Sequence, residues 1–226
     1  MRGLVRGRAC LFSGNDLAPT RRSSPRRREH GVQRVSASHT ASSAEGGAHR
    51  PPSSAHLVLI GLRAAGKSTV GAALAARRGL PFVDLDEHTR RRLGCTTIRE
   101  AFERAGEIAF RQAESEALAA ALGAPASVLA LGGGTPTAPG AADRLADARR
   151  DGRAFVIFLD LPVEVLAARL RRQEGDRPSL TGRGVVEEIG ELAAARRPLY
   201  AALADLRLLD DVDPESLVSI ITSHVC

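Results

Sequence analysis

The sequence predicts an α/β fold in which helices flank a five-stranded, mostly parallel sheet. Two observations carry this prediction. From residue 55 onward, short apolar runs alternate with helical stretches, which is the pattern of a doubly wound sheet with right-handed crossovers. Each run is apolar along most of its length, as strands buried on both faces of a sheet should be. The expected strands are His56–Ile60, Pro81–Asp84, Ser127–Leu131, Ala154–Leu159 and Leu206–Leu209.

Helices are expected in the gaps between these strands. The alanine-rich stretch Ser68–Arg78 follows the first strand, and a helix from Pro162 to Arg172 follows the fourth. A longer helical insert, Thr97–Gly123, begins with a Thr-x-x-Glu capping box. Ligands of such sheets bind outside the carboxyl ends of the strands, so functional residues are expected there.

Composition divides the chain into two parts. At 226 residues and 43% hydrophobic content, it is long enough for one sizeable domain. Ten arginines and three acids give residues 1–55 a net charge of +7, so the remainder carries −1 of the overall +6. Residues 1–55 are rich in Ser, Arg, Pro and Gly without apolar periodicity, which predicts a disordered basic tail before a nearly neutral domain at 56–226. The positive net charge of the whole chain therefore does not indicate nucleic-acid binding by the domain.

Three explanations of the basic tail stay open at this point. It fits an organelle transit peptide, an upstream extension from a misplaced start codon, or a basic arm that binds nucleic acid or an acidic partner. The sequence contains no secretory leader pattern and no run of 18 apolar residues. Cys10, Cys95 and Cys226 show no C-x-x-C pattern, which favours a reducing compartment and no cysteine metal site. We expect a cytoplasmic protein, or a plastid protein if the tail is a transit peptide.

The strongest motif lies between the first strand and the first helix. Gly61, four further residues and then Gly66, Lys67 and Ser68 have the spacing of a P-loop. Glycines let backbone N–H groups turn toward a phosphate, the lysine reaches the β- and γ-phosphates, and the serine hydroxyl can bind Mg²⁺. Lys67 is the only lysine of the chain. Ala64 occupies a position where many small-molecule kinases have glycine, and would be strained if that position requires a positive φ.

Two carboxylates end the second strand. Asp84 and Asp86 are spaced i and i+2, so on a strand both would face the P-loop. One could serve a metal ion and the other a substrate hydroxyl. Alternatively, these acids cap the next helix, above all Asp86.

Later motifs supply arginines and a glycine turn. Glu107, Arg111 and Glu114 share one helical face, either as a surface salt-bridge ladder or as part of a site. The turn Gly132–Gly134 would let a ligand approach backbone N–H groups closely, unless it is only a loose turn.

Two further arginines are candidates for the site. Arg177 lies in a polar, glycine-punctuated stretch that suggests a closing lid, where it could meet the transferred phosphoryl group, or remain free in solvent. Arg196 is a candidate carboxylate clamp.

Taken together, these motifs resemble the shikimate kinase family over residues 56–209. The resemblance rests on the P-loop G-L-R-A-A-G-K-S-T, the D-L-D from Asp84, the F-R-x-x-E from Phe110, the triple glycine, the R-P-S-L from Arg177 and the R-R-P-L-Y from Arg196. It implies the P-loop kinase fold and the ATP-dependent phosphorylation of the 3-hydroxyl of shikimate. The family often carries an arginine in its adenine-side loop near the C-terminus, where this chain has D-V-D-P from Asp211.

Residue roles follow from the resemblance and the chemistry together. The catalytic candidates are Lys67, Asp86 and Arg177. Shikimate would be held by Asp86, Arg111, Gly132, Gly133, Gly134 and Arg196, and Mg²⁺ by Ser68 and Asp84. ATP would be bound by Ala64, Ala65, Gly66, Lys67, Ser68, Thr69 and Arg177. We expect a monomer whose partners are ATP and shikimate.

Two alternatives remain from the sequence. One is a related enzyme, such as a gluconate-type or nucleoside monophosphate kinase, although two arginines suit a carboxylated substrate better than a nucleoside. The other is a ligand-sensing regulator that keeps this domain to bind an effector, although the tail lacks the apolar pattern of a helix-turn-helix.

Overall fold

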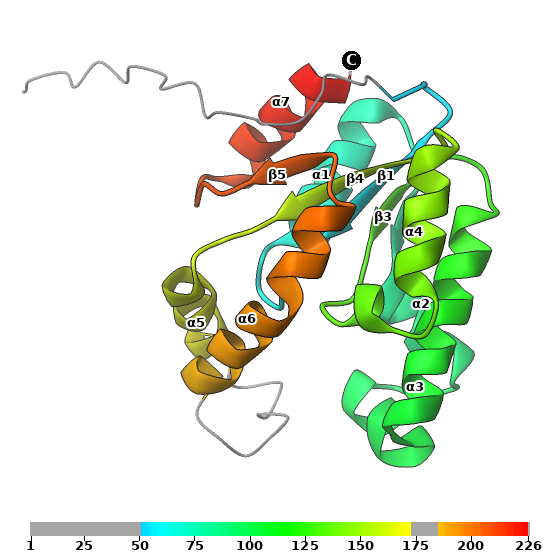
Figure 1. Cartoon of the computed structure of the whole chain (residues 1–226), viewed down its shortest axis with the longest axis vertical. Coiled ribbons are helices and arrows are strands. Elements are labelled where there is room, and N and C mark those ends of the chain that lie inside the picture. The colour runs from blue at the N-terminus through cyan, green and yellow to red at the C-terminus, as the bar shows by residue number, and fades with distance from the viewer. Residues whose placement is uncertain (1–50, 173–184, 226) are drawn as a thin grey trace, which may run out of the picture. The chain divides into compact units, whose positions relative to one another are not determined.

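The computed structural model describes residues 51–172 and 185–225. Within these ranges five strands form one sheet whose paired strands are all parallel, in the order β2-β3-β1-β4-β5 (Figure 1). The strands are β1 (His56–Ile60), β2 (Phe82–Asp84), β3 (Val128–Ala130), β4 (Ala154–Leu159) and β5 (Leu206–Leu208). The predicted α/β fold with a five-stranded parallel sheet is therefore confirmed.

Helices connect every pair of consecutive strands, and one further helix follows β5. They are α1 (Lys67–Arg78), α2 (Leu85–Arg92), α3 (Ile98–Leu122), the 3₁₀ turn η1 (Thr135–Thr137), α4 (Ala141–Arg150), α5 (Val163–Arg172), α6 (Val185–Leu203) and α7 (Pro214–Val225). Helix α1 packs against β3 and α7, whereas α4 and α6 pack against β4. With right-handed crossovers, this strand order places α1 on the opposite face of the sheet from α3 and α4.

Burial explains why the central strands are apolar throughout. Every residue of β1 and β4 is buried, whereas β2, at the edge of the sheet, is only half-buried and β5 alternates. The core spans both faces of the sheet and includes Leu74 of α1 and Leu145 of α4, each with 0% exposure. A rigid sheet of this kind fixes the loops at its carboxyl edge.

The helical insert differs from its prediction at two points. Thr97 caps α3 by accepting a hydrogen bond from the Glu100 N–H at 3.0 Å, as the capping box predicts. The Glu100 carboxylate, however, accepts from the N–H and hydroxyl of Thr96, both at 2.7 Å, rather than from Thr97. Gly106, with φ 75° and ψ 165°, interrupts the helix, which the sequence did not predict.

Within the described ranges, no helix combines the length and the apolarity needed to cross a membrane. The predicted lid with Arg177 lies outside the described residues, as does the basic tail up to residue 50.

Candidate active site

The P-loop connects β1 to α1 at the carboxyl edge of the sheet. Gly66 adopts φ 94° immediately before the helix, a conformation that favours glycine. Lys67 donates hydrogen bonds to the carbonyls of Gly61 at 3.0 Å and Leu62 at 2.8 Å. The lysine side chain therefore folds back over its own loop.

Ala64 has a φ of 59°, the only positive value for a non-glycine residue in the ranges 51–172 and 185–225. An alanine in this left-handed region is strained by roughly 1–2 kcal/mol. The strain that we expected if this position required a positive φ is therefore present. The carbonyl of Ala64 accepts a hydrogen bond from Arg169 Nη1 at 3.1 Å.

Ser68 and Asp84 meet directly. The Ser68 hydroxyl donates to Asp84 Oδ2 at 2.6 Å, so two oxygen ligands suited to Mg²⁺ lie side by side. The other carboxylate oxygen of Asp84 accepts from the N–H groups of Asp86 and Glu87 and caps α2.

Two sequence predictions about these acids are corrected here. The strand ends at Asp84, and Asp86 lies in the first turn of α2, so the two side chains are not related by strand alternation. The helix-capping role, which we considered as the alternative and above all for Asp86, belongs to Asp84. Asp86 nevertheless lies at the triple glycine, because a Cβ added to Gly132 would overlap Asp86 Oδ1.

Arg111 is held by a buried carboxylate. Its Nη1 donates to Glu114 Oε2 at 2.6 Å, and Glu114 Oε1 accepts from the Thr135 hydroxyl at 2.8 Å. The Glu114 side chain is 2% exposed, and burial raises its pKa, an effect that Arg111 opposes and the charge of Asp86 reinforces. Glu107 lies 3.8 Å from Arg111 and is 71% exposed. The interpretation as a surface ladder is therefore wrong for Glu114.

The triple-glycine turn contacts both Arg111 and Arg196. A Cβ on Gly134 would overlap Arg111 Nη1, so only glycine leaves room for this guanidinium. The Gly133 carbonyl accepts from Arg196 Nη1 at 2.7 Å and from the Tyr200 hydroxyl at 2.8 Å. A Cβ on Gly133 would lie 3.2 Å from the backbone N of Arg63, so this turn also abuts the P-loop. The interpretation of the glycines as a loose turn is wrong.

Tyr200 is a residue of the site to which sequence reasoning gave no role. Its side chain is fully buried, and burial raises the pKa of its hydroxyl to about 12. It therefore stays a hydrogen-bond donor to the Gly133 carbonyl at all ordinary pH values. The only sequence signal was its place in the R-R-P-L-Y segment.

The predicted residues fall into two connected groups. Ala64 to Thr69 form the P-loop and the first turn of α1, where the Ala65 side chain is buried and Thr69 is exposed. Asp86, Arg111, Gly132–Gly134 and Arg196 gather around the glycine turn. Arg177 lies outside the described residues.

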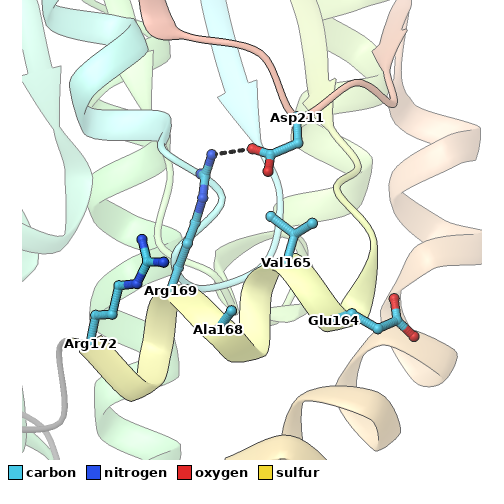
Figure 2. A pocket seen from close by; sticks show the side chains of 6 residues that line it. All are labelled: Glu164, Val165, Ala168, Arg169, Arg172 and Asp211. Atoms are coloured by element: carbon cyan, nitrogen blue, oxygen red, sulfur yellow. Dashed lines mark hydrogen bonds and ion pairs between the residues drawn. The ribbon is translucent and has the colours of Figure 1, made fainter. Parts of the chain in front are cut away.

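A groove of about 450 Å³ lies beside the P-loop. Figure 2 shows its lining residues, which come from α5 and from the segment after β5: Glu164, Val165, Ala168, Arg169, Arg172 and Asp211. Arg169 Nη2 pairs with Asp211 Oδ1 at 2.6 Å across the groove. Asp211 is the first residue of the D-V-D-P segment. Its carboxylate therefore pairs with Arg169, a partner that the sequence did not reveal.

The fold and the site together define a protein class. A P-loop in a parallel sheet of order 2-3-1-4-5, with acids and arginines from neighbouring helices around the Gly132–Gly134 turn, is the arrangement of a kinase that phosphorylates a small molecule.

Comparison with known proteins gives the family. The family model for shikimate kinase matches residues 63–225. A shikimate kinase of Nitratidesulfovibrio vulgaris is 45% identical over 167 residues, which cover 73% of this chain and 92% of that protein. A shikimate kinase 2 of Syntrophotalea carbinolica is 40% identical over 168 residues, or 72% and 91% of the two chains. The chain belongs to the shikimate kinase family, and the resemblance seen in its motifs is confirmed.

Solved structures agree with this assignment. The shikimate kinase from Acinetobacter baumannii, solved in complex with shikimate, superposes with a TM-score of 0.68 at 31% identity and covers 76% of this chain and 96% of its own. The shikimate kinase from Aquifex aeolicus gives a TM-score of 0.61 at 30% identity, covering 75% and 95%.

Proposed function

We propose that the protein transfers the γ-phosphoryl group of ATP to the 3-hydroxyl of shikimate. The observation that carries this proposal is the Arg111–Glu114 pair beside the triple glycine, because it presents a fixed guanidinium next to Asp86 in a chain of this family. Family membership supports the choice of substrate, as does the similar structure of the Acinetobacter baumannii enzyme, which was solved in complex with shikimate.

The phosphate side of the site would act through charge. Phosphoryl transfer needs positioning and neutralisation of charge more than covalent chemistry. On binding, Lys67 would exchange its two loop carbonyls for phosphate oxygens. Ser68 and Asp84 would hold Mg²⁺, which would offset the negative charge of the phosphates. Their adjacent oxygens fit this ion, since Mg²⁺ usually takes only one or two protein ligands besides phosphates and waters.

The acid side would orient shikimate. Arg111 and Arg196 would bind its carboxylate through charge-assisted hydrogen bonds, and the Gly132–Gly134 turn would allow close approach. Asp86 would orient the 3-hydroxyl and accept its proton. Arg177 is proposed, from sequence alone, to meet the transferred phosphoryl group from a lid.

A turnover assay tests the function. The purified chain with Mg²⁺ and ATP is offered shikimate, gluconate or a nucleoside monophosphate, and the phosphorylated product is identified by mass spectrometry. We expect ADP and shikimate 3-phosphate in equal amounts, with little product from the other two. Tight shikimate binding without any turnover would instead favour the regulator, and preference for gluconate would favour the related kinase.

Further proposals concern the whole chain. We propose a cytoplasmic monomer in which residues 1–55 play no part in catalysis. Deletion of residues 1–53 should leave turnover and melting temperature almost unchanged, because that composition offers little to pack against a domain. A fall of many degrees in melting temperature would contradict this domain boundary.

A further inference from the structure

A buried carboxylate at the end of β4 has no part in the site described so far. Asp160 directly follows β4, at the carboxyl edge of the sheet, and its side chain is 3% exposed. It accepts hydrogen bonds from Arg197 Nε and from Arg207 Nε, both at 2.8 Å. A carboxylate in such a place needs partners, because an unpaired buried charge is costly. The two arginines meet this need from different elements, α6 and β5.

Arg197 does more than neutralise the charge of Asp160. While its Nε pairs with that carboxylate, its Nη2 donates to the carbonyl of Leu161 at 2.6 Å. The planar fork of one guanidinium therefore binds two successive residues after β4, which restrains both the distance and the direction of α6. Arg207 donates to Asp160 from Nε and Nη2, and so ties β5, rather than α6, to the same carboxylate.

Arg197 is the chain neighbour of Arg196, the carboxylate clamp proposed above. Successive residues of a helix lie about 100° apart around its axis, so the two side chains face different parts of the molecule. Arg196 Nη1 donates to the Gly133 carbonyl at 2.7 Å, whereas Arg197 is bound beside Asp160. Adjacent residues of α6 thus contact the end of β4 and the glycine turn after β3. A rotation of α6 that releases Arg197 would also displace Arg196 from the turn.

The backbone of α6 is weakened at this point. Pro198 lies inside the helix, directly after the two arginines. A proline has no N–H to donate to the carbonyl four residues earlier, and its ring presses against that carbonyl, so the helix is prone to bend there. The backbone hydrogen bonds of α6 therefore hold Arg196 less firmly than those of an uninterrupted helix would. Contacts of side chains with the sheet edge supply the missing restraint.

We propose that Arg197, anchored by Asp160, is a positioning residue for shikimate, which holds the proline-containing part of α6 in place so that Arg196 stays at the glycine turn. This inference rests on the proposed function, in so far as Arg196 binds the substrate carboxylate. It assigns neither Arg197 nor Asp160 a contact with the ligand. The competing explanation is that the ion pair stabilises the fold and has no bearing on the site.

A double-mutant cycle separates these explanations. Equilibrium binding of shikimate is measured for Arg197→Ala, Arg196→Ala and the double variant. We expect Arg197→Ala to weaken shikimate binding roughly fivefold, because Arg196 must then be ordered when the ligand arrives. In the Arg196→Ala background the same change should cost about twofold or less, since no clamp is left to position. Equal losses in both backgrounds, or no loss in either, would overturn the proposal.

Arg207→Ala is the matched control. It removes an arginine from the same carboxylate, and in each single variant Asp160 keeps one arginine partner, so both proteins should fold. Arg207→Ala should bind shikimate like the unaltered protein, because it leaves the contacts of α6 in place. Binding of Mg²⁺-ADP should be unchanged in both variants. An equal loss of shikimate affinity in both, or a parallel loss of ADP affinity in Arg197→Ala, would show a role in the fold alone and would overturn the proposal.

Hydrogen exchange of the free protein tests the proposal without any ligand. The amides of residues 199–202 should exchange roughly fivefold faster in Arg197→Ala, because this part of α6 loses its restraint, and should not change in Arg207→Ala. Alanine has the highest helix propensity, so the substituted residue itself would not accelerate exchange. Unchanged exchange would overturn the proposal. Failure of the unaltered protein to bind shikimate would count against the proposed function, while the exchange data would still decide the role of Arg197.

Discussion

The two sides of the site hold their cations in opposite ways. On the phosphate side, Lys67 donates to two carbonyls of its own loop, within six residues along the chain. On the acid side, Arg111 is paired with a carboxylate that is 2% exposed, and Arg196 is bound to the Gly133 carbonyl from another helix. The phosphate side is thus one short segment, whereas the acid side is assembled from α3, the turn after β3, and α6.

We therefore expect the phosphate side to rearrange when a ligand binds, whereas the acid side is already arranged before binding. Neutral carbonyls hold an ammonium group loosely, so a phosphate can take their place at little cost. A buried carboxylate fixes the guanidinium before any ligand arrives, and pre-positioned donors lose less entropy on binding. We therefore expect losses on the phosphate side to affect turnover most, and losses on the acid side to affect affinity.

The largest effect is expected for Lys67→Ala. Without the ammonium group, the charge that develops on the transferred phosphoryl group is less well offset, and turnover should fall by on the order of 10²- to 10³-fold. Circular dichroism should show an intact fold, and equilibrium binding of shikimate should be nearly unchanged. If shikimate affinity fell as much as turnover, the two sides would not be independent, and the comparison would fail.

Arg111→Ala should have the next largest effect, on affinity. Loss of a charge-assisted hydrogen bond to the substrate carboxylate should raise the dissociation constant for shikimate roughly 10- to 100-fold. The effect should fall chiefly on the KM for shikimate, since the same interaction serves ground state and transition state, and the KM for ATP should change much less. Calorimetric titration with shikimate and, separately, with ADP checks both values. Normal shikimate binding by this variant would show that Arg111 does not hold the acid.

Gly134→Ala sharpens the comparison at a smaller scale. The added Cβ would overlap Arg111 Nη1, so the guanidinium should shift from the place where Glu114 holds it, at some cost in stability. Shikimate affinity should fall about fivefold, because the charge remains but its placement is lost. Gly190→Ala is the matched control: it lies in α6 with nothing within 4 Å, and should stabilise the protein by roughly 0.5–1 kcal/mol without changing affinity. Equal affinity in both variants would show that the position of Arg111 is not critical.

The same contrast explains what the sequence could predict. The bounds of β1 and β4 were predicted to the residue, because strands buried on both faces are apolar throughout. The P-loop was recognised because its parts are adjacent in the chain. The kink at Gly106 was missed, since a lone glycine in a helical pattern does not reveal whether the helix continues through it.

Contacts between distant segments were the other omission. Thr135 and Tyr200 reach Glu114 and the Gly133 carbonyl across 21 and 67 residues, and no local pattern encodes such distances. The role of Asp84 as cap was considered only as an alternative, and above all for Asp86, for a different reason. The spacing of Asp84 and Asp86 was interpreted as strand alternation, but the strand ends at Asp84, two residues before Asp86.

The smallest expected effect concerns the pH dependence of stability, and it tests whether the acid side holds a costly buried charge. Burial raises the folded-state pKa of Glu114 above its usual value near 4.5. A carboxyl group with a raised pKa favours the folded state most when it is protonated, so this contribution is complete below pH 4.5 and is lost as the pH rises through the folded-state pKa.

The variant Glu114→Gln tests this expectation, because a glutamine side chain does not titrate. As the pH rises from 4 to 7, this variant should become more stable relative to the unaltered protein. Urea unfolding at several pH values measures this difference. Glu107→Gln removes a carboxylate of the same helix that is 71% exposed, and shows how much of the change follows from charge alone. A stability difference between Glu114→Gln and the unaltered protein that stays constant over this range would mean that Arg111 offsets the burial of Glu114 completely.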